Sequence, residues 1–173
     1  MLWKLIGCLC ILTASSGLGY FQGIEYRRQI QEMHCLEQLI REIGGEISYT
    51  KAPLPEIFLR TARYCRSPYS LWLREMAREM QEKGAVQLGV LWENRTRKIL
   101  GTLPLDSEEM NELSQVGYQM NHLDIRMQEQ TLIWYVTRLE ERRGRKEKIL
   151  YEKQRLSNLL GVSAGLFLVI LLM

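Results

Sequence analysis

The chain has 173 residues, of which 46% are hydrophobic and 25% are charged, and its formal net charge is +3. This length accommodates one globular domain with short anchors, and the composition is that of an ordinary globular protein. A net charge this small gives no indication of a nucleic-acid partner. The four cysteines do not form a disulfide framework, because Cys8 and Cys10 lie in one apolar segment while Cys35 and Cys65 lie in separate predicted helices. The pattern indicates a reducing compartment.

The first apolar segment covers residues 5–24, which follow Lys4 and contain no charged residue. Twenty uncharged residues can span a bilayer. A secretory signal peptide is the alternative, because small residues at positions 14–17 follow a short apolar run. A cleaved signal would leave the basic residues at 142–155 on the wrong side of the membrane, so the favoured prediction is a retained span over residues 1–24.

The second apolar segment covers residues 156–173, and in helical form it would be roughly 27 Å long, close to the thickness of a hydrocarbon core. Between Arg142 and Arg155 there are seven Lys or Arg and two Glu, and no basic residue follows. This asymmetry predicts a membrane span with its basic side in the cytoplasm, beside anionic lipid headgroups. A buried core helix is the alternative, but residues 166–172 are apolar all round. The predicted organisation is a two-pass membrane protein with a cytoplasmic domain at residues 25–155.

The predicted cytoplasmic domain begins with an amphipathic helix from residue 30 to about residue 49, in which Gly44-Gly45 weakens the end without breaking it. Two prolines predict a turn over residues 51–55. Pro55 suits the first turn of a second helix. The apolar residues assigned to that helix are Ile57, Phe58, Ala62 and Cys65.

A third helix is predicted to open with Ser67 as N-cap and Pro68 at the first position, and to end at Gly84. A fourth helix is expected over residues 86–100, followed by a loop over residues 101–105. The large aromatic residues of the third, fourth and last helices are expected in the core. They are Trp72, Trp92 and Trp134.

In the second half of the domain, Asp106 and Glu109 have the spacing of a capping box. The helix that follows contains Gly117, which is interpreted as a close contact between helices. Residues 121–124 predict a break, after which one long helix runs from Asp124 into the C-terminal segment. The predicted fold class is therefore an all-α bundle of five to six helices, flanked by N- and C-terminal transmembrane helices.

Residues suited to catalysis are few. The two histidines, His34 and His122, are far apart in sequence, and the chain has no HExxH or CxxC spacing and no glycine-rich nucleotide loop. We therefore predict a protein that is not an enzyme, with no catalytic residue, no metal site and no cofactor. A partial metal site of His34, Cys35 and Cys65 is the alternative, although buried thiols more often act as small hydrophobic groups.

Asp124 and Gln128 form a polar pair spaced i, i+4 at the start of the long helix. They are interpreted as capping or cross-linking neighbouring helices through hydrogen bonds, and the alternative is a polar patch that docks a partner protein. Gly19/Gly23 and Gly161/Gly165 are small-residue spacings that would allow the two spans to approach closely.

Several short motifs occur in a fixed order along the chain. They are Leu39-xx-Glu42-xxx-Glu46-Ile47-x-Tyr49, Pro53-Leu54-Pro55-Glu56, Leu91-Trp92 and Gly117-xxxx-His122-Leu123-Asp124-xxx-Gln128. With apolar segments at both ends, the chain resembles over its whole length the stage III sporulation protein AB family of endospore-forming bacteria.

This resemblance implies a membrane platform in a channel complex of the mother-cell membrane that surrounds the forespore. The helical domain would be similar to the platform protein of type II secretion and type IV pilus systems. Implied partners are a separate secretion-type ATPase, other membrane components of the channel, membrane lipid and further copies of the chain. The cytoplasmic polar surface that meets the ATPase would include Glu42, Glu46, Asp124 and Gln128. The alternatives are a membrane-anchored helical regulatory protein and a membrane-bound enzyme acting on lipid or peptidoglycan precursors.

Overall fold

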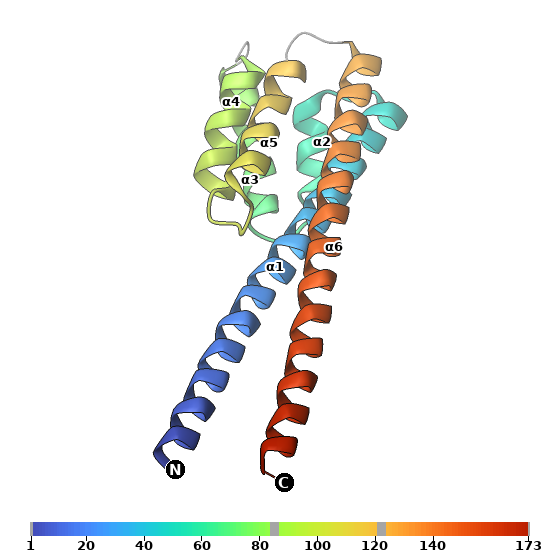
Figure 1. Cartoon of the computed structure of the whole chain (residues 1–173). Helices are drawn as coiled ribbons and strands as arrows, with labels where there is room; N and C mark the ends of the chain where they lie inside the picture. Colours follow the sequence, from blue (N-terminus) through green and yellow to red (C-terminus); the bar gives the residue numbers. More distant parts are fainter. Residues whose placement is uncertain (1, 84–86, 121–123, 173) are drawn as a thin grey trace. The chain divides into compact units, whose positions relative to one another are not determined.

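The computed structural model describes the backbone of residues 2–83, 87–120 and 124–172, and the side chains of residues 24–82, 87–120, 124–156, 159 and 163. Within these ranges the structure has six α-helices, one π-helical segment and no strand (Figure 1). The elements are α1 (Leu2–Thr50), α2 (Leu54–Thr61), α3 (Tyr69–Lys83), α4 (Leu88–Arg95), the π-helical η1 (Thr96–Leu100), α5 (Ser107–Met120) and α6 (Ile125–Leu172). This arrangement confirms the predicted all-α class.

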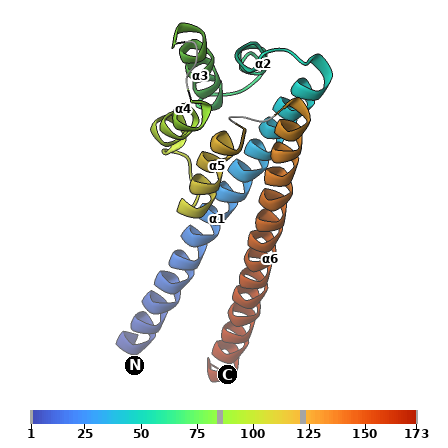
Figure 2. The same ribbon diagram turned by 90° about the horizontal axis from the view of Figure 1, so that it is seen from above.

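The chain divides into two compact units, to which α1 and α6 both contribute. Residues 31–143 form the first unit, here called the helical body. Residues 1–30 and 144–173 form the second unit, here called the helix pair. Within the helix pair, the segments of α1 and α6 run antiparallel, and both ends of the chain lie at the same end of the pair (Figures 1 and 2).

The core of the helical body follows the predicted helical spacing. α1 buries one stripe of apolar side chains, and α6 buries a second one. Since full burial of a Leu or Ile side chain stabilises a fold by roughly 1.5–3 kcal/mol, these stripes are major contributions to the stability of the body. Around them, α2 packs against α3, and α4 packs against α5. The two stripes consist of Met33, Leu36, Leu39, Ile40, Ile43 and Ile47 on α1 and of Leu132, Tyr135, Val136 and Leu139 on α6.

An aromatic cluster lies between α2, α3 and α4. The rings of Trp72 and Trp92 meet edge to face with centroids 4.8 Å apart, and the ring of Phe58 lies 6.1 Å from that of Trp92. The indole nitrogen of Trp92 donates a hydrogen bond of 2.7 Å to the carbonyl oxygen of Leu113 on α5. Trp72 and Trp92 are fully buried, which confirms their predicted place in the core.

Trp134 was also predicted to be a core residue, and this prediction is wrong. Its side chain is 49% exposed, and the guanidinium of Arg138 lies 4.8 Å from the centre of its ring. The reason is helical geometry: the core face of α6 passes through Leu132, Tyr135 and Val136, and a residue between these positions points away from it.

Glycines allow α4 and α5 to approach closely. A Cβ atom added at Gly117 would overlap the side chain of Trp92, and one added at Gly89 would lie 2.9 Å from the Cα of Tyr118. The interpretation of Gly117 as a close contact between helices is therefore confirmed.

Several helix boundaries differ from the prediction. The second helix already ends at Thr61. The third begins at Tyr69, because the amide of Trp72 donates to the carbonyl of Pro68, which makes Pro68 rather than Ser67 the N-cap. The predicted fourth helix starts at Leu88 and becomes π-helical over η1. The predicted stop at Gly84 and most of the predicted break at residues 121–124 lie outside the described residues.

The predicted capping box at the start of α5 is supported by the hydrogen bond from the backbone of its first residue to the carboxylate of its last. The amide of Asp106 donates to Glu109 Oε2 at 2.6 Å, and the amide of Met110 donates to the carbonyl of Asp106 at 3.0 Å. The acidic residue at the third position thus satisfies a backbone donor before the first turn.

Across the side chains that the structure describes, no helix offers a stretch of sufficient length and apolarity for a membrane crossing. The predicted spans at residues 1–24 and 156–173 fall almost entirely on side chains outside this part of the chain, as do the glycine pairs Gly19/Gly23 and Gly161/Gly165. The spans therefore stay predictions.

Candidate interaction surface on helices α1 and α6

A groove of about 200 Å³ lies between α1 and α6 of the helical body, and its lining combines apolar residues with two glycines and two charged residues. Ile133 stands at this groove with 56% of its surface exposed, although Leu132 and Val136 beside it are buried. The lining residues are Ile40, Arg41, Gly44, Gly45, Glu129, Leu132, Ile133 and Val136.

Two glycines form part of the groove wall inside the long helix α1. A Cβ atom at Gly44 would lie 3.8 Å from Leu132 Cβ, which is ordinary van der Waals contact, and a Cβ atom at Gly45 would meet nothing within 4 Å among the described residues. Glycine in a helix interior costs about 1 kcal/mol relative to alanine. At Gly45 no neighbouring atom of the described residues excludes a side chain, so internal packing does not explain why a glycine stands there. Gly45 is exposed and leaves this part of the groove wall without a side chain.

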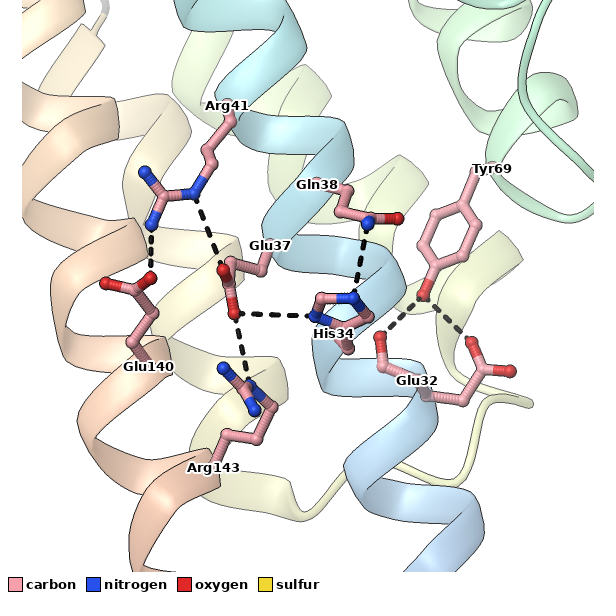
Figure 3. Close-up of polar contacts among 8 residues, drawn as sticks. All are labelled: Glu32, His34, Glu37, Gln38, Arg41, Tyr69, Glu140 and Arg143. Atoms are coloured by element: carbon pink, nitrogen blue, oxygen red, sulfur yellow. Dashed lines mark hydrogen bonds and ion pairs between the residues drawn. The ribbon is translucent and has the colours of Figure 1, made fainter.

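An ion-pair network joins α1 and α6 beside the groove (Figure 3). The carboxylate of Glu37, which is only 5% exposed, lies 3.4 Å from Arg41 Nε and 3.2 Å from Arg143 Nε. Arg41, which also lines the groove, forms a second ion pair with Glu140 of α6. Because a buried carboxylate requires charged or hydrogen-bonding partners, this network fixes the two helices relative to each other along the groove.

The same region of α1 is joined to α3 on another side (Figure 3). The hydroxyl of Tyr69 donates to Glu32 Oε2 at 3.0 Å. Burial raises the pKa of Tyr69, and the neighbouring Glu32 carboxylate raises it further. Glu32 also pairs with Arg66, which donates to Cys35 Sγ at 3.5 Å.

The partial metal site considered for His34, Cys35 and Cys65 receives no support from the described residues, which contain no group of three or more metal-ligating side chains. His34 Nε2 instead shares a hydrogen bond of 3.2 Å with Gln38, and its Nδ1 lies 3.9 Å from Glu37. Burial raises the pKa of the Cys65 thiol, and the negative charge of Glu42 adds to this effect.

A buried cation, Arg142, ties α6 to α5. Arg142 is 8% exposed, and its Nη2 lies 2.8 Å from Glu108 and 2.5 Å from Glu112. Arg138 reaches the same Glu112 carboxylate at 3.1 Å. Thus Glu112 accepts two arginines, and α6 is held by carboxylates of α5 as well as of α1.

The structure assigns local roles to three of the four residues predicted to bind a partner. Asp124 Oδ1 accepts a hydrogen bond of 2.9 Å from the amide of Met127 and caps α6. Gln128 donates to the carbonyl of Met120 at the end of α5, at 3.3 Å. These contacts confirm the interpretation of Asp124 and Gln128 as capping and cross-linking residues.

The other two predicted residues lie on α1. Glu46 pairs with Arg60 of α2 at 3.1 Å, whereas Glu42 is exposed and has no ion-pair partner among the described residues. No hydrogen bond or ion pair within the described chain joins this pair of residues to Asp124 or Gln128. Their binding of a partner stays a prediction.

The sequence patterns gave weak signals for the groove. Two consecutive glycines in a helix and an i, i+4 pair of Glu37 and Arg41 were visible, but neither shows which distant helix lies beside them. Glu140 and Arg143 lie about a hundred residues away, inside a highly charged run, and nothing in that run distinguishes them.

Comparisons with known proteins agree with this fold. The family model described as Stage III sporulation protein AB matches residues 4–173. The "Stage III sporulation protein AB" of Bacillus subtilis (strain 168) is 25% identical over 170 residues, which cover 98% of this chain and 99% of that protein. A solved structure of "Stage III sporulation protein AB (SpoIIIAB)" is 22% identical to this chain and has a TM-score of 0.63. The match covers 72% of this chain and 97% of the solved chain, and it shows that the two share a fold. Since the family model matches almost the whole sequence, the chain belongs to the stage III sporulation protein AB family.

Proposed function

We propose that this sporulation protein is a membrane-anchored scaffold, and that its helical body docks a partner protein in the groove between α1 and α6. The observation that carries this proposal is the groove itself, which is open at Gly45 and apolar at Ile133. Recognition of an amphipathic helix in an apolar groove is a common mode of protein binding.

The chemistry of the groove indicates the kind of helix it accepts. Gly45 is exposed on the groove wall, and Ile133, which is 56% exposed, suits an apolar face of a partner. Glu129 lines the groove and forms no ion pair with another described residue, so a Lys or Arg beside the apolar face of the partner would be complementary to it. The Glu37 network supports the walls, so that the groove is ready before binding and little ordering is required.

The partner we propose is the secretion-type ATPase of the same sporulation complex. The sequence has no nucleotide loop of its own, so energy for transport would come from a separate protein. In this proposal the chain is a two-pass protein of the mother-cell membrane around the forespore, with residues 25–155 in the cytoplasm and with spans at residues 1–24 and 156–173. It would assemble there with further copies of itself and with the other membrane components of the channel.

The test is to fill the groove without disturbing the core. Gly45→Trp would place a ring in the open space, and Gly45→Ala is the matched control because it adds a methyl group and leaves the groove open. In cells that carry each variant as the only copy, we expect Gly45→Trp to reduce heat-resistant spores by at least tenfold at normal protein level, and Gly45→Ala to have no effect. Normal spore numbers with Gly45→Trp would contradict the groove as a docking surface.

A photo-crosslinking amino acid identifies the occupant. We would place it at Ile133, with Leu71 on α3 as a control of similar exposure, 56% against 49%. A cross-link to a P-loop ATPase from Ile133 only supports the proposal. A cross-link from Ile133 to a soluble signalling protein would favour the alternative of a membrane-anchored regulatory protein.

A further inference from the structure

Basic side chains from opposite ends of the sequence come together in the helix pair. The Nζ atom of Lys153 on α6 lies 4.6 Å from the centre of the Tyr26 ring on α1. Lys146 Nζ donates a hydrogen bond of 3.1 Å to Gln29 Oε1. These two contacts place residues 25–29 of α1 beside residues 145–155 of α6, a proximity that the sequence does not show.

The two units differ in charge. The helix pair contains eight Lys or Arg and three Glu, a net charge of +5, whereas the helical body contains fifteen Lys or Arg and seventeen Asp or Glu, a net charge of −2. The positive charge of the whole protein therefore resides in the helix pair. Five of its cations are exposed and lie near no carboxylate within ion-pair distance among the described residues. They are Arg27, Arg28, Arg145, Lys148 and Arg155.

In contrast to these exposed cations, most arginines of the helical body form ion pairs: nine of them pair with carboxylates of the same unit. They are Arg41, Arg60, Arg66, Arg78, Arg95, Arg97, Arg138, Arg142 and Arg143. The five exposed cations of the helix pair have no carboxylate at ion-pair distance among the described residues, so they are available to anions outside the chain.

Aromatic residues lie at the same level of the helix pair. Tyr26 contacts Lys153, and Tyr151 is 69% exposed beside it in sequence. Tyrosines together with lysines and arginines are typical of the headgroup layer of a membrane, where a ring can lie against acyl chains and a cation can lie against phosphate.

We propose that this segment of the helix pair, here called the basic collar (residues 25–29 and 145–155), binds the headgroups of anionic phospholipids. This inference rests on the membrane anchoring in the proposed function, because the predicted spans end at residue 24 and begin at residue 156. The sequence already predicted anionic headgroups beside residues 142–155; the inference adds that cations of α1 and α6 together form one site that selects negatively charged lipids. Each Lys or Arg near an anionic surface strengthens binding by about fivefold, and salt weakens this attraction.

The test uses the full-length protein in nanodiscs that contain phosphatidylglycerol and phosphatidylcholine in equal amounts. After release from the nanodiscs, native mass spectrometry counts the lipids that remain bound to the protein. We expect retained phosphatidylglycerol to exceed phosphatidylcholine by at least tenfold. Inorganic phosphate added in millimolar excess should leave the number of bound lipids unchanged. If phosphate displaces the bound lipid, the assignment to lipid headgroups is overturned.

The variant removes three exposed cations that make no described contact, by Arg28→Gln, Arg145→Gln and Lys148→Gln together. The matched control removes three exposed cations of the helical body, by Arg63→Gln, Arg74→Gln and Arg126→Gln. We expect the preference for phosphatidylglycerol to fall by tenfold or more in the first protein and to be unchanged in the second. Equal preference in both proteins would overturn the inference.

Membrane insertion is measured separately by alkaline extraction of the same proteins from vesicles. A protein that inserts and shows no lipid preference overturns the basic collar alone. A protein that is extracted into the aqueous phase overturns the proposed anchoring and, with it, this inference.

Discussion

Two pairs of glycines lie where helices of the helical body meet, and the two pairs differ in how much space surrounds them. Between α4 and α5, Gly89 and Gly117 meet a neighbouring side chain so closely that a Cβ atom would overlap it. Beside the groove, Gly44 and Gly45 have room for a Cβ atom. The first pair is required by the packing of the chain itself. The second pair lowers the stability of α1 without an internal gain, which is the pattern expected for a surface shaped for a partner.

Among these glycines, we expect a substitution at the contact between α4 and α5 to lower the free energy of unfolding most. Gly117→Ala would place a methyl group within the space of the Trp92 side chain, so the helices must separate or Trp92 must leave its place. Overpacking of this kind costs about 3 kcal/mol. We expect this loss in the free energy of unfolding of the full-length protein in detergent, followed by tryptophan fluorescence in urea. An unchanged stability would show that the α4–α5 contact is looser than described.

The ion-pair network beside the groove should give the next largest effect. Glu37→Ala would remove the carboxylate that Arg41 and Arg143 share, and the partly buried Arg143 would lose this ion pair, at a cost of about 2 kcal/mol. Glu82→Ala is the control, because its ion pair with Arg78 is exposed on both sides, at 54% each, and such pairs contribute about 0–1 kcal/mol. Equal losses in the two variants would mean that the network does not fix the groove.

A buried tyrosine in α6 should make stability depend on pH above 10. Burial raises the pKa of Tyr135, and the charges of Glu112 and Glu109 raise it further. The unfolded chain then loses this proton at a pH of about 10 while the folded chain keeps it. The contribution to stability is present below that pH and is lost above it, by at most about 1.4 kcal/mol per pH unit.

Tyr135→Phe tests this effect, because it removes the titrating group and keeps the ring. The hydroxyl of Tyr135 has no hydrogen-bond partner within the described residues, so at pH 7 we expect a stability within about 1 kcal/mol of the original protein. Urea unfolding at pH 8 and at pH 11 should show a smaller loss in the variant than in the original protein. Parallel losses would exclude Tyr135 as a source of the pH dependence.

The helices of the body could be predicted from sequence because their signals are local. Apolar spacing gave the buried stripe of α1, and Asp106 with Glu109 gave the start of α5. The groove could not be predicted, because it depends on which helix lies beside Gly45, and Glu140 and Arg143 are far away in sequence. Trp134 shows the same limit: its size predicted burial, whereas the rotation of α6 about its axis decided its exposure.

The smallest change in stability is expected at Gly45. It is also the change that best distinguishes the two glycine pairs. Gly45→Ala should raise the free energy of unfolding by about 1 kcal/mol, since the methyl group meets nothing within 4 Å and alanine favours the helix. Gly117→Ala, with the same chemical change, should move stability in the opposite direction. If urea unfolding shows that Gly45→Ala also destabilises the protein, the space beside Gly45 is filled within the protein. The glycine would then be explained by internal packing, and the groove would lose its main support as a docking surface.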